Sequence, residues 1–115
     1  MLMLLEKNLT LEDAARHIIN GHERTLVFHD ENKKLIGVIS QGDILRAIWN
    51  GMSVISPILD IINYNPIVID VNKTNKFEIA IEHFVQVGTL VVPVVDDLRI
   101  VIDVIRVREI LNVQK

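Results

Sequence analysis

An internal repeat limits the folds open to this chain more than any other feature of its sequence. Apolar residues recur at helical spacing at positions 11, 14, 15, 18 and 19, and an offset of 66 residues places them on apolar positions 77, 80, 81, 84 and 85. The same offset carries Met1–Leu5 onto Ile67–Val71, and Asp30 onto Asp96. A constant offset through a strand, a helix and a hairpin indicates an internal duplication.

The match extends through the last strand and the last helix of each half if the turn at Asp96–Asp97 is three residues shorter than its counterpart in the first half. An offset of 63 then carries residues 35, 38, 39, 44 and 48 onto residues 98, 101, 102, 107 and 111. Each half reads β-α-β-β-α, and a half of about 50 residues is too small to bury its own sheet comfortably. We therefore expect an α/β (α+β) fold, with two tandem β-α-β-β-α repeats packed sheet to sheet around a pseudo-twofold axis.

The expected elements divide the chain into a first repeat at residues 1–52, a linker at 53–66 and a second repeat at 67–115. The first repeat is expected to hold strands at 1–5, 25–28 and 35–39, and helices at 11–19 and 43–49. In the linker, Ser56 and Pro57 predict the N-cap and first residue of a short helix that ends near Ile62. The second repeat is expected to hold strands at 67–71, 90–95 and 98–102, and helices at 77–85 and 105–111.

Composition narrows the classes of partner. The net charge is −3 without a basic cluster, which argues against nucleic acid. No apolar run approaches the ~18 residues of a membrane span, and the start of the chain lacks the basic region of a signal peptide. The chain has no cysteine, which excludes disulfides and cysteine-based metal or redox chemistry. We expect a cytoplasmic protein that binds neither nucleic acid nor membrane.

The polar corner Ser40-Gln41-Gly42-Asp43 joins an apolar strand to a periodic helical segment. Ser40 is suited to be an N-cap, and Asp43 stands three residues later, as in a capping box with Asp in place of Glu. Such a corner exposes backbone N–H groups that can hold an anion, and it offers a hydroxyl and a carboxylate suited to ribose hydroxyls. A plain helix cap is the alternative interpretation, and it is the commoner use of this pattern.

Together, the duplication and the sequence G-V-I-S-Q-G-D-I-L from Gly37 resemble a CBS-domain pair, or Bateman module. Residues 92–96, V-P-V-V-D, resemble the family's PVVD strand, and residues 65–69 resemble its usual first strand. Among CBS pairs, those that precede sugar-nucleotidyltransferase domains are most similar to this chain in three segments: the GDILRAI stretch, Gly51 and the linker. The sequence is compatible both with a fragment linked to such an effector domain and with a short stand-alone protein.

The resemblance implies a regulatory module that binds AMP, ADP, ATP or S-adenosylmethionine and requires no cofactor. By position, Ser40 would contact the ribose–phosphate region and Asp43 the ribose hydroxyls. Ile39 and the Thr25–Leu26 stretch are the candidates for contacts with adenine.

At the second corner, Asp103 and Arg106 match Ser40 and Asp43, so we expect one nucleotide site per chain. A carboxylate at Asp103 would repel a phosphate, and Arg106 cannot accept a hydrogen bond from a ribose hydroxyl. Two uses of this corner stay open: surface or dimer-contact charges, or a different anion held by Arg106 or Arg108.

Neither catalysis nor a metal site is predicted. The four histidines are scattered without ligand spacing, and no nucleophile–base pair or convergent carboxylates occur. Trp49 could belong to the core or to a homodimer interface of the kind that CBS pairs commonly use. The alternative function is a structural homodimerisation module without a nucleotide ligand, in which Ser40 and Asp43 serve as helix caps alone.

Overall fold

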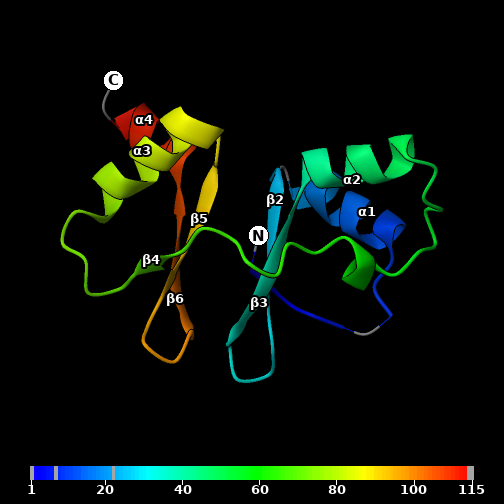
Figure 1. Ribbon diagram of the computed structural model, residues 1–115, viewed down its shortest axis with the longest axis horizontal. Coiled ribbons are helices and arrows are strands. Elements are labelled where there is room, and N and C mark those ends of the chain that lie inside the picture. The colour runs from blue at the N-terminus through cyan, green and yellow to red at the C-terminus, as the bar shows by residue number, and fades with distance from the viewer. Residues whose placement is uncertain (1, 7, 22, 114–115) are drawn as a thin grey trace. The chain divides into compact units, whose positions relative to one another are not determined.

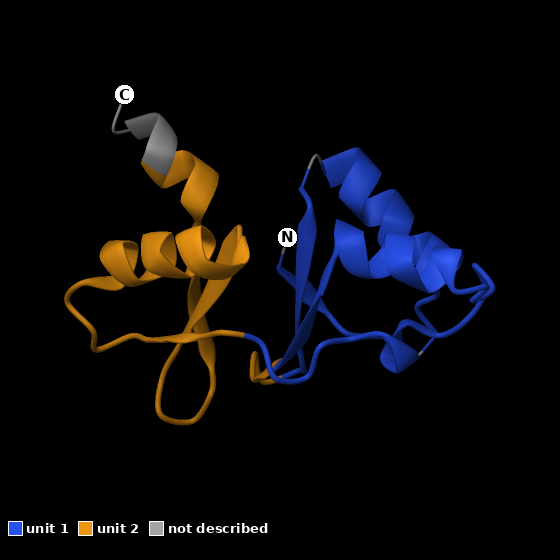
Figure 2. Cartoon of the chain, turned by 45° about the horizontal axis from the view of Figure 1, so that its top comes forward, with its two compact units in different colours: residues 1–31, 36–66 blue, residues 32–35, 67–115 orange. Residues whose placement is uncertain are grey.

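The structure, a computed structural model, describes residues 2–6, 8–21 and 23–113. It divides into two compact units: unit 1 comprises residues 1–31 and 36–66, and unit 2 comprises residues 32–35 and 67–115 (Figure 2). The described residues form two three-stranded sheets and four α-helices. The predicted mixed α+β class is therefore confirmed. The repeat boundaries and the packing of the sheets against each other stay predictions.

Unit 1 has the order β-α-β-β-α followed by one 3-10 turn (Figure 1). Its elements are β1 (Leu2–Leu4), α1 (Leu11–Gly21), β2 (Thr25–His29), β3 (Leu35–Ser40), α2 (Gln41–Trp49) and η1 (Ile58–Asp60). The sheet order is β1-β2-β3, and β1 runs parallel to β2. β3 leads directly into α2, so the polar corner at Ser40 lies where the strand ends and the helix begins.

Unit 2 repeats this order with β4 (Ile69–Asp70), α3 (Lys76–Val87), β5 (Val91–Val95), β6 (Val101–Arg106) and α4 (Val107–Val113). The sheet order is β4-β5-β6, with β4 parallel to β5 and β5 antiparallel to β6. Gly88 ends α3 in the left-handed conformation, with φ 77°, as a C-cap glycine should.

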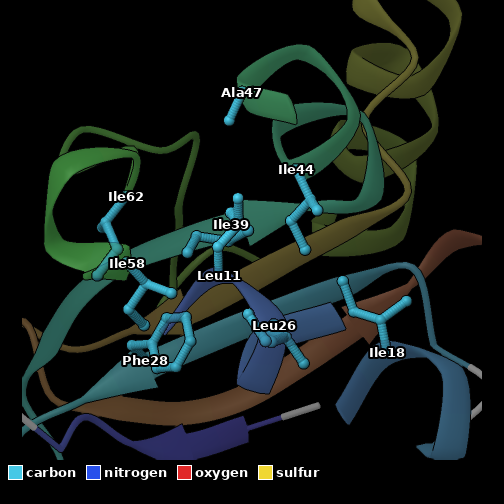
Figure 3. Close-up of a cluster of buried hydrophobic side chains, with 10 residues drawn as sticks. Leu11, Ile18, Leu26, Phe28, Ile39, Ile44, Ala47, Ile58 and Ile62 are labelled. Atoms are coloured by element: carbon cyan, nitrogen blue, oxygen red, sulfur yellow. The ribbon is translucent and has the colours of Figure 1, made fainter. Parts of the chain in front are cut away.

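An aliphatic core with one aromatic residue holds unit 1 together (Figure 3). The apolar stripe of α1, the inner residues of β2 and β3, and the inner face of α2 meet in one cluster with the linker turn. Its buried members are Leu11, Ala14, Ile18, Leu26, Phe28, Ile39, Ile44, Ala47, Ile58 and Ile62. Burial of a single large apolar side chain contributes about 1.5–3 kcal/mol, so this cluster stabilises the elements that carry the corner.

The structure corrects the register predicted for the second half. β2 and β5 begin 66 residues apart, and so do β3 and β6. One offset therefore covers the repeat from β2 through β6, and the predicted three-residue deletion is wrong. The position that matches Ser40 is Arg106, and the position that matches Asp43 is Glu109.

The turn between β5 and β6 explains this error. Lys33 and Arg99, also 66 residues apart, both have positive φ angles, 63° and 67°, so the two hairpins turn in the same way. Oδ1 of Asp96 accepts hydrogen bonds from the N–H groups of Leu98 and Ile100, both at 2.9 Å, which holds Leu98 at the tip of the turn. Leu98 is 73% exposed and begins no strand, although its apolar character suggested one.

The linker helix predicted from Ser56 to Ile62 is also wrong, because only η1 is helical there. Pro57 has extended φ and ψ angles of −61° and 138°, and it forms a β-bridge with Thr10. The N–H of Leu11 donates to the Ser56 carbonyl at 2.9 Å, and the N–H of Ile58 donates to the Leu9 carbonyl at 3.0 Å. Pairing with the segment before α1 thus takes the place of helix formation.

Smaller differences concern element ends. α2 begins at Gln41 and not at Asp43, because Ser40 caps it. β4 covers two residues of the five predicted, and α4 begins at Val107, two residues later than predicted. Met1, predicted as the start of the first strand, lies outside the described residues.

Candidate functional site

Ser40 and Asp43 form the predicted capping box at the start of α2. Ser40 has extended angles, φ −99° and ψ 162°, and its Oγ accepts the N–H of Asp43 at 3.2 Å. Oδ2 of Asp43 accepts the N–H of Ser40 at 2.8 Å. Two N–H groups that the helix would otherwise leave unpaired are thereby satisfied, which fixes the carboxylate beside the hydroxyl.

Arg46, one turn along α2, occupies the other oxygen of the carboxylate. Its Nη2 lies 2.5 Å from Oδ1 of Asp43, and the two side chains are 70% and 28% exposed. The guanidinium lies over Gly42, where a Cβ would stand 3.2 Å from Nη1. Sequence reasoning missed Arg46, although the spacing of three residues on a helix is the signal that places it beside Asp43.

Gly37 lets a second segment lie beside β3, three residues before the corner. Val38 and Asn63 exchange backbone hydrogen bonds of 3.0 and 2.9 Å. A Cβ on residue 37 would stand 2.4 Å from the Asn63 carbonyl oxygen and 2.5 Å from Cγ2 of Ile62. Only glycine leaves room for this contact, which supports the end of β3 from the side opposite to β2.

The residues predicted to contact adenine lie next to the corner, and all of them are buried. The N–H of Gln41 donates to the Arg24 carbonyl at 2.7 Å, which joins the start of β2 to the start of α2. Leu26 and Ile39 are both 0% exposed, and Thr25 is buried as well. Leu26 and Ile39 belong to the core cluster of unit 1, whereas Thr25 does not, and the contact of these residues with adenine stays a prediction.

A hollow of about 460 Å³ begins at Asp43 and follows one face of α2. Three residues of α2 and its C-cap line it at helical spacing: Asp43, Arg46, Ala47 and Asn50. The segment after α2 and the linker complete the lining with Gly51, Met52 and Ile61. Polar side chains from α2 thus stand beside an apolar part formed by Ala47, Met52 and Ile61. Of these residues, the sequence predicted only Asp43 as a binding residue.

The second corner differs from the prediction because of the corrected register. Asp103 lies within β6, where its Oδ1 accepts the N–H of Val104 at 2.7 Å, so it caps no helix. Arg106 ends β6 in the place of Ser40, and Glu109 stands in the place of Asp43. A hollow of about 480 Å³ lies here, lined by Phe77, Asp103, Val104, Ile105, Arg106, Glu109 and Ile110. The hydroxyl is thus replaced by a cation, while a carboxylate remains.

A second capping box in unit 1 has the same geometry as the corner. Oδ2 of Asp13 accepts the N–H of Thr10 at 3.0 Å, and Oγ1 of Thr10 accepts the N–H of Asp13 at 3.2 Å. The Thr10 N–H lowers the pKa of Asp13 most, and the Thr10 hydroxyl lowers it further. The box alone therefore does not define a ligand site, but Thr10 and Asp13 provide a matched control for Ser40 and Asp43.

Apolar side chains remain exposed on α2. Trp49 is 89% exposed, and Leu45 and Ile48 are exposed too. The interpretation of Trp49 as a core residue is wrong, and the interpretation as an interface residue stays a prediction. Within residues 2–6, 8–21 and 23–113, no group of three or more histidines and carboxylates is placed to hold a metal ion. No helix among these residues is long and apolar enough to cross a membrane.

Comparisons with known proteins give a family match and several structural neighbours. Residues 2–50 match the family model of the CBS domain. The fold is similar to that of the CBS domain protein PAE2072 from Pyrobaculum aerophilum complexed with AMP, at 22% identity and a TM-score of 0.76 over 93% of this chain and 81% of that one. It is also similar to ATU1752, a CBS-domain containing protein from Agrobacterium tumefaciens, at 14% identity and a TM-score of 0.82 over 100% and 90% of the two chains.

A further neighbour is the CBS domain pair of protein MJ0100 in complex with 5′-methylthioadenosine and S-adenosyl-L-methionine. The identity is 26% and the TM-score 0.78, over 98% of this chain and 91% of that one. Among curated proteins, none matches this chain. The family match and the neighbours support a CBS-domain pair, whereas the predicted association with a nucleotidyltransferase domain is not confirmed.

Proposed function

We propose that this chain is a regulatory CBS-pair module that binds one adenosine-containing ligand at the Ser40–Asp43 corner. One observation carries the proposal: the hydroxyl and the carboxylate are held side by side by the capping box, within the segment that matches the CBS domain. The neighbours complexed with AMP and with S-adenosyl-L-methionine supply the class of ligand.

The corner has the chemistry that a ribose requires. The carboxylate of Asp43 can accept hydrogen bonds from ribose hydroxyls, and the hydroxyl of Ser40 can donate to a ribose or phosphate oxygen. Thr25, Leu26 and Ile39 remain the candidates to border the adenine, because the hydrogen bond from Gln41 to the Arg24 carbonyl brings the start of β2 beside the corner. AMP, ADP, ATP and S-adenosylmethionine share the adenosine group that these contacts recognise.

Regulation would follow from a difference in affinity between two states of the chain or of its assembly. The ligand shifts an equilibrium only by the difference between its binding free energies to the two states. The change in this equilibrium would alter the activity of a covalently linked effector, such as a nucleotidyltransferase domain, in the cytoplasm. This module would act without catalysing a reaction, since its role is to bind.

Isothermal titration with AMP, ATP and S-adenosylmethionine tests the proposal. The informative variant is Asp43→Asn, because an amide oxygen can still accept the Ser40 N–H while the negative charge is lost. Asp13→Asn is the matched control, since it makes the same change in the second capping box. We expect binding to the parent and to Asp13→Asn, and weakened binding to Asp43→Asn. If all three ligands are silent with the parent, or if both variants bind alike, the proposal is wrong.

A second candidate function is a structural homodimerisation module without a nucleotide ligand. The exposed apolar residues of α2, Leu45, Ile48 and Trp49, favour it, because a stable interface needs such side chains at its centre. Thermal melts separate the two functions. A ligand at 100 times its dissociation constant adds about 2.7 kcal/mol to the free energy of unfolding, whereas no nucleotide would shift the melt of a purely structural module.

A further inference from the structure

Both carboxylate oxygens of Asp43 already have partners. Oδ2 accepts the Ser40 N–H at 2.8 Å, and Oδ1 lies 2.5 Å from Nη2 of Arg46. A ribose hydroxyl that binds this carboxylate must therefore share or replace one of these two partners. A shared oxygen keeps its partner, because a carboxylate has about four acceptor sites. Where a partner is replaced, the exchange falls on Arg46, because the Ser40 N–H belongs to the backbone at the start of α2 and is fixed there.

Arg46 is suited to such an exchange. Its side chain is largely exposed, and exposed ion pairs contribute little to stability because water and salt screen them. The absence of a side chain at Gly42 gives the guanidinium space to move. Arg46 can leave Oδ1 without strain elsewhere, and it then stands as a cation beside the bound sugar.

The hollow beside Asp43 determines which ligand can use this cation. Arg46 and Asp43 are neighbouring residues of its lining, and Asn50 follows one turn further along α2. The 5′ substituent of a ribose lies one sugar ring away from its hydroxyls, within the span of an arginine side chain. A guanidinium binds phosphate oxygens through two parallel hydrogen bonds, whereas it repels the positive sulfonium of S-adenosylmethionine.

We propose that Arg46 is the specificity-determining residue of the corner. It pairs with Asp43 in the free protein, and it contacts the 5′-phosphate when a ribose takes its place on the carboxylate. The preferred ligand is therefore a 5′-phosphorylated adenosine rather than adenosine or S-adenosylmethionine. This inference rests on the proposed function, because it assigns the ligand class of the same site.

Titrations of the full chain with AMP, adenosine and S-adenosylmethionine test this role. Arg46→Gln removes the charge and keeps a polar side chain of similar length. Arg16→Gln is the matched control, because Arg16 is 68% exposed, against 70% for Arg46, and forms an ion pair of 2.5 Å with Glu12 on α1. Neither Arg16 nor Glu12 lines the hollow. Both variants lose one positive charge, so the change in net charge is the same.

We expect Arg46→Gln to weaken AMP binding by about tenfold, which corresponds to about 1.4 kcal/mol, while adenosine and S-adenosylmethionine bind as tightly as before or more tightly. Arg16→Gln should leave all three affinities unchanged. The inference is overturned if the ratio of AMP to adenosine affinity is unchanged in Arg46→Gln or falls equally in Arg16→Gln, or if the parent prefers S-adenosylmethionine. Silence of every ligand overturns the proposed function as well, whereas an unchanged ratio leaves that function standing.

Discussion

Gly37 and Gly42 should respond to alanine with opposite signs, because their surroundings differ. At residue 37 a Cβ would stand 2.4 Å from the Asn63 carbonyl oxygen and 2.5 Å from Cγ2 of Ile62. Carbon atoms do not approach so closely, so either β3 or the segment at Ile62–Asn63 must move. At residue 42 the nearest atom is Nη1 of Arg46, 3.2 Å away at the end of a flexible side chain.

The expected magnitude follows from these contacts. Overpacking in a close-packed region costs about 1–3 kcal/mol. If the Ile62–Asn63 segment moves away instead, the two hydrogen bonds between Val38 and Asn63 are lost, each worth about 0.5–1.5 kcal/mol. Both routes place the loss for Gly37→Ala at about 1–3 kcal/mol. Gly42→Ala should be neutral or stabilise by up to about 1 kcal/mol, because alanine reduces the entropy of the unfolded chain.

Urea denaturation followed by far-UV circular dichroism measures both variants, since the exposed Trp49 is a poor fluorescence probe of folding. With a slope of about 1–3 kcal/mol per molar urea, Gly37→Ala should lower the midpoint by about 1 M. Gly42→Ala should leave it unchanged or raise it. Equal stability of Gly37→Ala and the parent, or a larger loss in Gly42→Ala, would refute the packing described for β3.

Three further predictions concern the caps, the pH dependence and the exposed face of α2. Ser40→Ala and Thr10→Ala should each lower the free energy of unfolding by about 1 kcal/mol in chemical denaturation, because each removes one N-cap; a difference between parent and variants near zero would contradict the two capping boxes. The pKa of Asp13 is lower in the folded chain than in the unfolded chain, so the unfolded chain binds more protons in acid. The stability that the ionised Asp13 carboxylate contributes is therefore complete above about pH 4 and is lost as pH falls through the folded pKa. The free energy of unfolding, measured by chemical denaturation at several pH values in this range, should depend less on pH in Asp13→Asn than in the parent. An identical dependence on pH would count against the Thr10 hydrogen bonds. Trp49→Ser should leave the stability of a monomer within about 0.5 kcal/mol of the parent and weaken any dimer in analytical ultracentrifugation; an unchanged dimer would exclude α2 as its interface.

Local signals in the sequence predicted the corner correctly. The pair Ser40 and Asp43 forms a capping box through contacts within three residues, so no other part of the chain had to be known. The cap of α1 at Thr10 and the left-handed Gly88 at the end of α3 are local features of the same kind. Periodicity also identified the buried stripe of α1, although Ile19 at its edge is exposed.

Features that depend on contacts between distant segments could not be predicted. Ser56 and Pro57 have the pattern of a helix start, but backbone pairing with residues 9–11 keeps them extended. Leu98 was assigned to a strand because it is apolar, whereas the Asp96 side chain holds it in a turn. That error moved the second corner by three residues and concealed Arg106 and Glu109 as the counterparts of Ser40 and Asp43.

The residues predicted to contact adenine also could not be assigned from the sequence alone. An apolar residue beside a predicted site is equally suited to line a ligand or to fill the core, and the sequence does not distinguish the two. In the structure Leu26 and Ile39 belong to the core of unit 1. Arg46 was overlooked for a different reason, because a charged residue on an exposed helix face is common and acquires a role only from its 2.5 Å contact with Asp43.

Amide chemical-shift mapping of the ¹⁵N-labelled chain during titration with AMP locates the ligand site residue by residue. We expect the largest shifts on the amides of residues 40–43, no movement of the matched amides of residues 10–13, and saturation of the change by one equivalent of AMP. Amides at residues 40–43 that stay in place, or shifts concentrated at residues 103–110, would contradict an adenosine site at the Ser40–Asp43 corner.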